Sequence, residues 1–378
     1  MDPQIVENSY RNVHLDFISN KNGSNPSDIV FASLPVSLMV PILSLILPFI
    51  YPLRYSFMKY SSRIVFHLSV EVIIIIIPVV LCTTILAGNT FMNSLSLFIV
   101  IVTLFFVTPN FWKPSARTVD WNQLWHYPIS DQRPSFITNY RSGMSLATAI
   151  SILAVDFQIY PRRFVKTETF GYSLMDVGVG AFIFAHGLLG SRICHSKGQW
   201  SKIYPIIGLG FLRLLSVKSL DYHEHVSEYG VHWNFFFTLA LIKGIAALLK
   251  LPIRPSVIST LILVLYEIIL KLGLQNWILS DYPRNDFISS NREGIFSLFG
   301  YTYLYYTSME IGDYMKKPRA LFQDWVGLLI QLLVLSIVGW NSLPYCEAIF
   351  GQPSRRLANT TFCIWMVNQR FSAETLLI

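Results

Sequence analysis

The chain has 378 residues, of which 53% are hydrophobic and 13% are charged, and its mean hydropathy is +0.47. A soluble domain usually carries about 25% charged residues, so this much apolar side chain cannot be buried in one water-soluble core. The net charge of +7 does not indicate nucleic-acid binding, because the basic residues fall between apolar segments instead of along one face. The composition therefore predicts an integral membrane protein.

Apolar segments follow one another from residue 29 almost to the last residue. A helix needs about 20 apolar residues to cross the hydrocarbon core, and barrel strands are shorter and less continuously apolar. Pro35, Pro41, Pro48 and Pro78 should kink the first two spans. We predict an all-α, polytopic helical bundle with about eleven spans, at 29–51, 64–87, 91–109, 143–157, 174–190, 202–217, 231–249, 256–275, 295–312, 325–343 and 357–369.

The segments between the spans indicate an orientation. The stretch MDPQIVENSYRNVHLDF is polar and is not a cleavable signal peptide, so the first span is expected to direct insertion. If the N-terminus is lumenal, the cytosolic loops carry more Lys and Arg than the opposite loops. We therefore predict a lumenal N-terminal segment, residues 1–28, and a single multi-span membrane domain, residues 29–378.

The stretch AVDFQIYPRRFVKTETFGYSLMDVGVG, residues 154–180, concentrates charge in an otherwise apolar chain. Asp156 ends an apolar run, and Arg162, Arg163 and Lys166 follow within ten residues. A carboxylate at the membrane edge is costly unless it is paired or faces water, so it indicates a functional site. The alternative is that the three cations are interfacial anchors whose charges reach the lipid headgroups.

The glycines of the same stretch favour helix packing. The GVG sequence is not a phosphate loop, because it lacks both the GxGxxG pattern and a following Lys-Ser. Gly171, Gly178 and Gly180 would let helices approach closely. Asp176 falls near a predicted helix start, where its charge interacts favourably with the helix dipole. We therefore expect Asp176 to be structural first and a wall of the site second.

The stretch VKSLDYHEHVSEYGVHWNFFFTLAL, residues 217–241, places histidines and carboxylates before an aromatic run. Histidine beside a carboxylate suits general-base chemistry, so His225 and His232 are candidate bases. An interfacial loop with an aromatic belt is the alternative. The pair of His223 and His225 has no clear third ligand, and the four cysteines form no CxxC pair, so we predict no metal site.

Five stretches, taken in chain order, are distinctive when they are read together. They are HLDFISNKNGSNPSDI, AVDFQIYPRRFVKTETFGYSLMDVGVGAFIF, KSLDYHEHVSEYGVHWNFFFTLA, NREGIFSLFGY and RRLANTTFCIW. They resemble the GPI inositol acyltransferase family, called PIG-W type in animals and GPI-anchored wall transfer protein in fungi. Members have about thirteen spans. They usually continue with a further apolar span where this sequence ends in MVNQRFSAETLLI.

The resemblance implies an O-acyltransferase of the endoplasmic reticulum membrane. Such an enzyme moves a fatty acyl group, typically palmitoyl from palmitoyl-CoA, to the inositol 2-hydroxyl of glucosaminyl-phosphatidylinositol in GPI-anchor biosynthesis. It implies acyl-CoA as a co-substrate, membrane lipid as a partner and no tightly bound cofactor; the charge pattern already predicts no nucleic acid. The family's active site is placed on an Asp and a Lys that match Asp156 and Lys166 of this sequence.

Carried over to these positions, Asp156 would be the general base on the hydroxyl, and Lys166 would pair with it and stabilise the developing oxyanion. His225 and His232 are the reserve bases. The substrate-binding candidates are Arg162, Arg163, Glu168, Glu228, Asn234, Asn291 and Arg292. The first two suit a lipid phosphate, because guanidinium binds phosphate in a bidentate manner.

A polytopic lipid or solute transporter is the alternative function. Charged residues inside several spans would favour it, and Glu71, Lys243, Glu267 and Lys271 lie in apolar segments. Transporters are commonly built from internal repeats, and we find no such repeat in this sequence.

Overall fold

The computed structural model describes residues 22–50, 59–112, 121–129, 135–190, 199–219, 228–248, 254–375 and 377. Within these ranges the chain is helical and contains no β-strand. Two isolated bridges join Ser24 to Tyr172 and Pro128 to Leu321. The predicted all-α class is therefore confirmed.

The helices follow the predicted apolar segments closely, and each of the eleven predicted spans coincides with a helix or with a run of joined helices. They are α2 (Pro26–Ile50), α3 (Tyr60–Glu71) continuing through a π-helical turn (Val72–Ile76) into α4 (Ile77–Thr83), α5 (Thr90–Trp112), α6 (Trp121–Trp125), α7 (Ser135–Ala154), α8 (Leu174–Leu189), α9 (Gln199–Ser219), α10 (Phe235–Leu248), α11 (Pro255–Ile269) continuing through a second π-helical turn (Leu270–Leu274) into α12 (Gln275–Leu279), α13 (Phe287–Ser290), α14 (Arg292–Met315), α15 (Phe322–Phe350) and α16 (Thr360–Thr375).

Five of the described helical segments are long and apolar enough to cross a membrane: Pro26–Leu47, Tyr60–Thr83, Ala87–Thr108, Pro255–Leu279 and Phe322–Phe350. Two further apolar helices, α8 and α10, are shorter. The protein is thus a multi-pass helical membrane protein. That α7, α9, α14 and α16 also cross the bilayer, and that residues 29–378 form one domain, stay predictions.

The prolines act differently in the first two predicted spans. Helix α2 continues as a single helix past Pro35, Pro41 and Pro48. The next helical segment changes to a π-helical turn directly before the short helix that contains Pro78. Proline lacks an amide hydrogen, and irregular turns of this kind accommodate the missing helical hydrogen bond.

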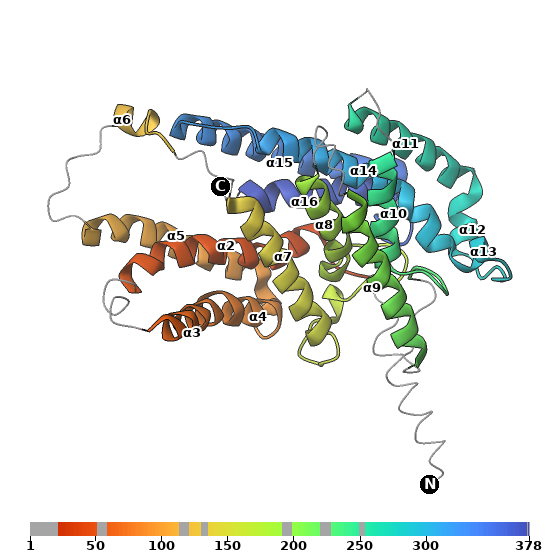
Figure 1. Ribbon diagram of the computed structural model, residues 1–378, viewed down its shortest axis with the longest axis horizontal. Helices are drawn as coiled ribbons and strands as arrows, with labels where there is room; N and C mark the ends of the chain where they lie inside the picture. Colours follow the sequence, from red (N-terminus) through yellow and green to blue (C-terminus); the bar gives the residue numbers. More distant parts are fainter. Residues whose placement is uncertain are drawn as a thin grey trace, which may run out of the picture.

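The bundle has a centre and two outer groups of helices (Figure 1). Helices α2 to α5 lie at one end of the molecule and α11 to α13 at the other. In the centre, α8 packs against α14, and α16 contacts α15, α14, α8 and α2. At Gly180 of α8, an added Cβ would lie only 2.4 Å from the sulfur of Met366 in α16. The predicted close approach of helices at this glycine is therefore confirmed.

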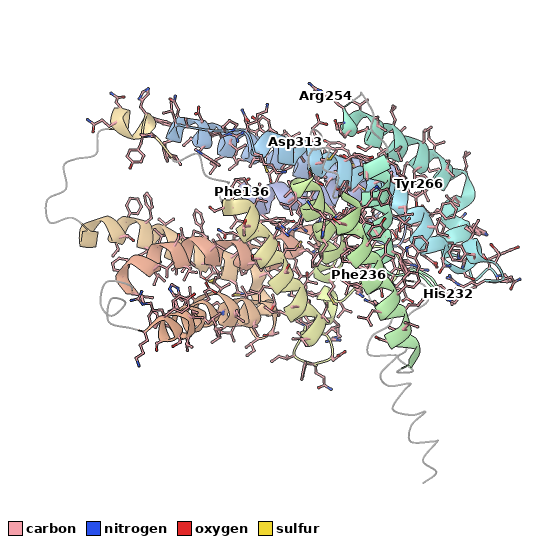
Figure 2. All side chains as sticks on the ribbon, viewed as in Figure 1. Phe136, His232, Phe236, Arg254, Tyr266 and Asp313 are labelled. Carbon is pink, nitrogen blue, oxygen red and sulfur yellow. The ribbon has the colours of Figure 1, made fainter. Side chains whose placement is uncertain are left out.

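Side chains mark two sides of the bundle around α10 (Figure 2). His232 lies just before the start of α10, and Arg254 lies just after its end, next to the start of α11. Figure 2 shows these two residues on opposite sides of the molecule. This arrangement is the one expected if α10 crosses the membrane once.

The segment between α15 and α16 is buried, although it is not helical. Residues 353–359 are all buried. The hydroxyl of Tyr301 donates to the carbonyl of Arg355 (3.0 Å), and the hydroxyl of Tyr266 donates to the carbonyl of Leu357 (2.7 Å). Since buried backbone carbonyls need hydrogen-bond partners, these two tyrosines hold the segment in one conformation.

Gly300 tests how tightly this segment is packed. A Cβ added to Gly300 would lie 1.9 Å from the carbonyl oxygen of Ala358, so we expect Gly300→Ala to destabilise the protein by about 2 kcal/mol or more. The matched control is Gly244→Ala in α10, where nothing lies within 4 Å of the added carbon. Thermal unfolding of the purified protein in detergent measures both changes. Equal melting temperatures for the two variants would contradict the packing argument.

Candidate active site

The connection between α7 and α8, residues 155–173, carries Lys166 and is anchored by its own aromatic residues. Tyr160 and Phe164 are fully buried, and their rings contact each other edge to face at 6.1 Å. Helix α7 has ended before Pro161, and a short 3₁₀ turn forms at Arg162–Phe164. Because both neighbours of Lys166, Val165 and Thr167, are buried, the position of its backbone is closely defined.

Arg162 and Arg163 use much of their hydrogen-bonding capacity inside the protein. Arg162 donates to the carbonyl oxygens of Val155, Phe157 and Tyr160 at 2.8 to 3.1 Å. Arg163 forms an ion pair with Asp28 of α2 (2.8 Å) and donates to a backbone carbonyl near the start of α5. These contacts stabilise the loop against α2 and favour a structural role over the predicted phosphate binding.

Lys166 and Glu228 form an ion pair whose atoms are 2.6 Å apart, from Nζ to Oε1. Glu228 lies in the segment before α10, and its Oε1 also accepts a hydrogen bond from Nη1 of Arg355 at 3.2 Å. The Nε of Arg355 donates to Oδ1 of Asp176 at 2.7 Å. One buried guanidinium therefore joins two carboxylates that come from different parts of the chain.

Asp176 lies in the first turn of α8, as predicted from the sequence. Its backbone N–H donates a hydrogen bond to the hydroxyl oxygen of Ser173, the N-cap residue of α8. Its Oδ2 accepts hydrogen bonds from the amide (3.0 Å) and the hydroxyl (2.6 Å) of Thr167. The carboxylate thus fixes the residue directly after Lys166.

Opposing effects act on the pKa of Glu228. Burial by itself would raise it, but the charges of Lys166 and Arg355 and the hydrogen bond from Lys166 outweigh burial and lower the pKa from 4.5 to about 2. The positive charge of Arg213 on α9 acts in the same direction. Glu228 is consequently a carboxylate at neutral pH, and it is too weak a base to accept a proton from an alcohol.

A cavity of about 510 Å³ reaches the ion pair of Lys166 and Glu228 and is lined by residues of α2, α4, α7, α8, α9, α10 and α16. Both Leu174, at the start of α8, and His186, near its end, line the cavity. Twelve helical residues span about 18 Å, so the cavity extends over more than half of a hydrocarbon core about 30 Å thick. Most of its lining is apolar, whereas Lys166, Glu228 and Arg213 bring charge to it.

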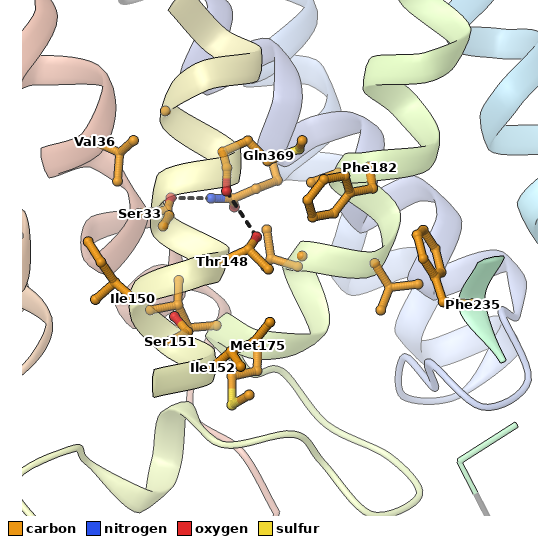
Figure 3. Close-up of a pocket in the computed structure, with 18 of the residues that line it drawn as sticks. Ser33, Val36, Thr148, Ile150, Ser151, Ile152, Met175, Phe182, Phe235 and Gln369 are labelled. Carbon is orange, nitrogen blue, oxygen red and sulfur yellow. Dashed lines mark hydrogen bonds between the residues drawn. The ribbon is translucent and has the colours of Figure 1, made fainter. Parts of the chain in front are cut away.

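Figure 3 shows the middle of this cavity. Gln369 of α16 points toward Ser33 and Thr148, and its amide nitrogen donates to the hydroxyl of Ser33. Phe182 and Phe235 lie on the other side, with ring centroids 6.1 Å apart. The mostly apolar side chains that line the cavity suit an extended apolar chain.

Asp156 lies in an exposed turn after α7 and is not among the residues that line the cavity. The predicted pairing of Asp156 with Lys166 is wrong, because Lys166 pairs with Glu228 instead. Asp156 lies close enough to Arg162 for its charge to act on that guanidinium. Its exposure to solvent and its place after α7 explain why it does not need the lysine as a counter-charge.

The remaining candidates are divided among structural contacts and the protein surface. Asn234 is buried and caps α10, accepting from the amides of Phe236 and Phe237. Asn291 is buried and accepts from the amide of His232, whose own side chain is exposed.

Arg292, Glu168 and His225 complete the predicted set. Arg292 is buried and donates to the carbonyls of Ser280 and Tyr282. Glu168 has an exposed side chain, and its carbonyl accepts from Arg356 at 3.2 Å. His225 lies outside the described residues.

Two cations were not assigned from the sequence. Arg355 was counted only as a loop cation, although it belongs to the quoted stretch RRLANTTFCIW. Arg213 interrupts the apolar run of α9 between Lys202 and Lys218, which is a signal that sequence reasoning could have used. For metals, no group of three His, Cys, Asp or Glu side chains gathers within the described part of the chain.

The fold and the site define a multi-pass helical membrane protein with ion-paired charges at the edge of a long, mostly apolar cavity. The GWT1 family profile matches residues 10–378. The chain therefore belongs to the GWT1 family.

Three curated relatives illustrate the similarity. Glucosaminyl-phosphatidylinositol-acyltransferase PIGW of Bos taurus is 39% identical over 249 residues, which are 61% of this chain and 50% of the relative. Phosphatidylinositol-glycan biosynthesis class W protein of Dictyostelium discoideum is 29% identical over 95% of this chain and 81% of the relative. GPI-anchored wall transfer protein 1 of Gibberella zeae is 31% identical over 95% and 78%. The match to the cattle protein thus spans about half of that relative's length.

Replacing Glu228 with Gln should destabilise the protein in a pH-dependent way. The lowered pKa means that the stabilisation from ionised Glu228 is complete above about pH 4.5 and is lost as the pH falls toward 2. Glu228→Gln should therefore melt at a lower temperature than the native chain at pH 7, and the difference should shrink below about pH 4. Thermal unfolding in detergent across this range measures it. A pH-independent difference would contradict the ion pairing.

Proposed function

We propose that this chain is an O-acyltransferase that transfers a fatty acyl group to the inositol ring of glucosaminyl-phosphatidylinositol in GPI-anchor biosynthesis. Membership of the GWT1 family and the similarity to the cattle glucosaminyl-phosphatidylinositol-acyltransferase support this assignment. The single structural observation that carries it is the apolar cavity, which reaches Lys166 in the loop before α8. A fatty acyl chain needs an apolar cavity, and the polar head of the lipid needs charged side chains beside it.

The donor that we propose is an acyl-CoA, typically palmitoyl-CoA, and the membrane is that of the endoplasmic reticulum. A thioester is already activated, so the chain needs no bound cofactor to make its acyl group reactive. The apolar lining contributed by α8 and α10 provides space for the acyl chain. No GxSxG sequence indicates a covalent acyl-enzyme, so we propose direct transfer.

In this reaction the inositol 2-hydroxyl oxygen attacks the thioester carbonyl carbon. A carbon–oxygen ester bond forms, the carbon–sulfur bond breaks, and the hydroxyl proton finally resides on the thiol of free CoA. The enzyme must remove that proton in the transition state and stabilise the negative charge on the former carbonyl oxygen. A carboxylate and a nearby cation can supply these two functions.

We assign the proton transfer to Asp156 and the oxyanion to Lys166. Glu228 is a poor base because its pKa is about 2. Its role in this proposal is to orient Lys166 through their ion pair. Asp156 is exposed at the end of α7, where an incoming inositol headgroup could reach it. His232 remains the reserve base, since its side chain is also exposed.

Arg213 is the cation that we assign to the phosphate of the acceptor lipid. It lines the cavity together with Lys166 and Glu228, and its neighbours Phe211 and Leu212 are exposed apolar residues suited to lipid. Guanidinium groups bind phosphate well at such positions. Arg162 and Arg163 are less suitable, because they bond to loop carbonyls and to Asp28.

The transporter alternative is not favoured. Two of the intramembrane charges that motivated it have internal partners: Glu267 accepts from the amide and hydroxyl of Thr360, and Lys271 donates to the carbonyl of Ile349. Charges satisfied in this way are expected of a stable bundle and do not define a transport pathway.

The proposed function is tested by acyl transfer in membranes. The chain is expressed in cells that lack their own inositol acyltransferase, and labelled palmitoyl-CoA is supplied. Asp156→Asn and Lys166→Met should each lower the rate of acylated product by about 10²-fold or more. Asp281→Asn, at another exposed aspartate, is the control and should leave the rate unchanged. A well-folded native chain that forms no product would refute the assignment.

Arg213→Ala should weaken use of the acceptor lipid. Because a lost phosphate contact acts mainly on binding, we expect KM for glucosaminyl-phosphatidylinositol to rise about tenfold while kcat and KM for palmitoyl-CoA change little. Arg213→Lys should recover part of the loss. Parallel changes in both KM values would argue against this assignment.

A further inference from the structure

Arg355 is a buried cation with an unusual set of partners. Its side chain is 4% exposed, and it bridges Asp176 at 2.7 Å and Glu228 at 3.2 Å. Its guanidinium also lies 5.8 Å from the centre of the Tyr229 ring. Its backbone carbonyl is held by the hydroxyl of Tyr301, so neither the backbone nor the side chain can move easily.

The contacts of Arg355 close a ring around Lys166. On one side, Glu228 binds both Arg355 and the ammonium group of Lys166. On the other side, Asp176 binds both Arg355 and the amide and hydroxyl of Thr167, the residue after Lys166. Lys166 is thus held through its side chain and through its backbone, and both routes meet at one guanidinium.

This ring requires an arginine. A planar guanidinium presents several N–H donors at fixed angles and can bind two carboxylates in different directions, whereas an ammonium group is a point charge on a flexible stem. The four charges of Lys166, Glu228, Arg355 and Asp176 sum to zero. Removing Arg355 alone would leave the two carboxylates with a single cation in a poorly hydrated place, which is costly.

We propose that Arg355 is a positioning residue for the acyl transfer reaction, which holds Glu228 and Asp176 so that Lys166 stays at the edge of the cavity. This inference rests on the proposed function of Lys166. Among the described residues, Arg355 is not one of those that line the cavity. It acts through its two carboxylate partners.

The neighbouring Arg356 provides a matched control. It is also buried, at 8% exposure, and it pairs with Glu293 at 3.3 Å instead of with Glu228. Arg356 also donates to the backbone carbonyl of Glu168 at 3.2 Å. Loss of Arg356 removes no partner of Glu228 or Asp176, so it should affect folding and leave the Lys166–Glu228 ion pair intact.

Three variants separate positioning from folding. Arg355→Met removes the cation and should lower both the melting temperature and the yield of folded protein. Arg355→Met combined with Asp176→Asn restores the charge balance and keeps hydrogen-bond acceptance for Thr167, so stability should largely return. In this double variant we still expect kcat to fall to about a tenth of the native value or below, because displacement of a catalytic group lowers the rate. Arg355→Lys should be intermediate in kcat, and Arg356→Met should retain native kcat per folded molecule.

A second readout does not depend on activity. The rate at which an amine-acylating reagent modifies Lys166 in the purified protein is measured by mass spectrometry. The double variant should be modified severalfold faster than the native chain, since Glu228 is no longer held against Lys166, and Arg356→Met should match the native rate.

The outcomes distinguish the two proposals. Native kcat and native labelling of Lys166 in the stable double variant would overturn the positioning role, whatever the function of the chain. Faster labelling of Lys166 in a chain whose native form makes no acylated product would support the positioning role and refute the proposed function.

Discussion

The pairing of one buried guanidinium with two carboxylates is the constraint on which this structure depends most. Arg355 comes from the segment before α16, Asp176 from the first turn of α8, and Glu228 from the segment before α10. Charges removed from water are tolerated only when they are paired at close range. These three parts of the chain must therefore meet in one arrangement, and that arrangement aligns the helices that surround the cavity.

The same arrangement places the charged side chains of Lys166 and Glu228 beside the apolar cavity. The side chains of α8 that line the cavity are mostly apolar, while the loop that precedes α8 carries Lys166. The ion pair of Lys166 and Glu228 is partly buried, with side chains 40% and 17% exposed, so it interacts more strongly with a charge that develops in the cavity than it would in bulk water. Glu228 stays ionised under these conditions because two cations bind it.

The sequence predicts the helices of this fold better than it predicts the contacts between side chains. Long apolar runs such as 29–51 and 325–343 coincide with α2 and α15, since backbone groups in lipid must bond within their own helix. Side-chain partners were harder to predict. Lys166 and Asp156 are close in sequence, yet Lys166 binds Glu228, which is 62 positions away. Closeness in sequence does not predict which side chains pair once the chain folds back on itself. Asn234, predicted to bind substrate, caps α10.

The sequence by itself determined that the protein is an all-α membrane protein, which regions are helical, and which stretches carry the residues typical of its family. These properties follow from local composition and spacing, which folding does not change. Only the tertiary structure decided the partners of Lys166 and the importance of Arg355, which lies 179 positions from Asp176. It also decided where the cavity lies, because the cavity is formed by side chains from seven helices that no local pattern connects.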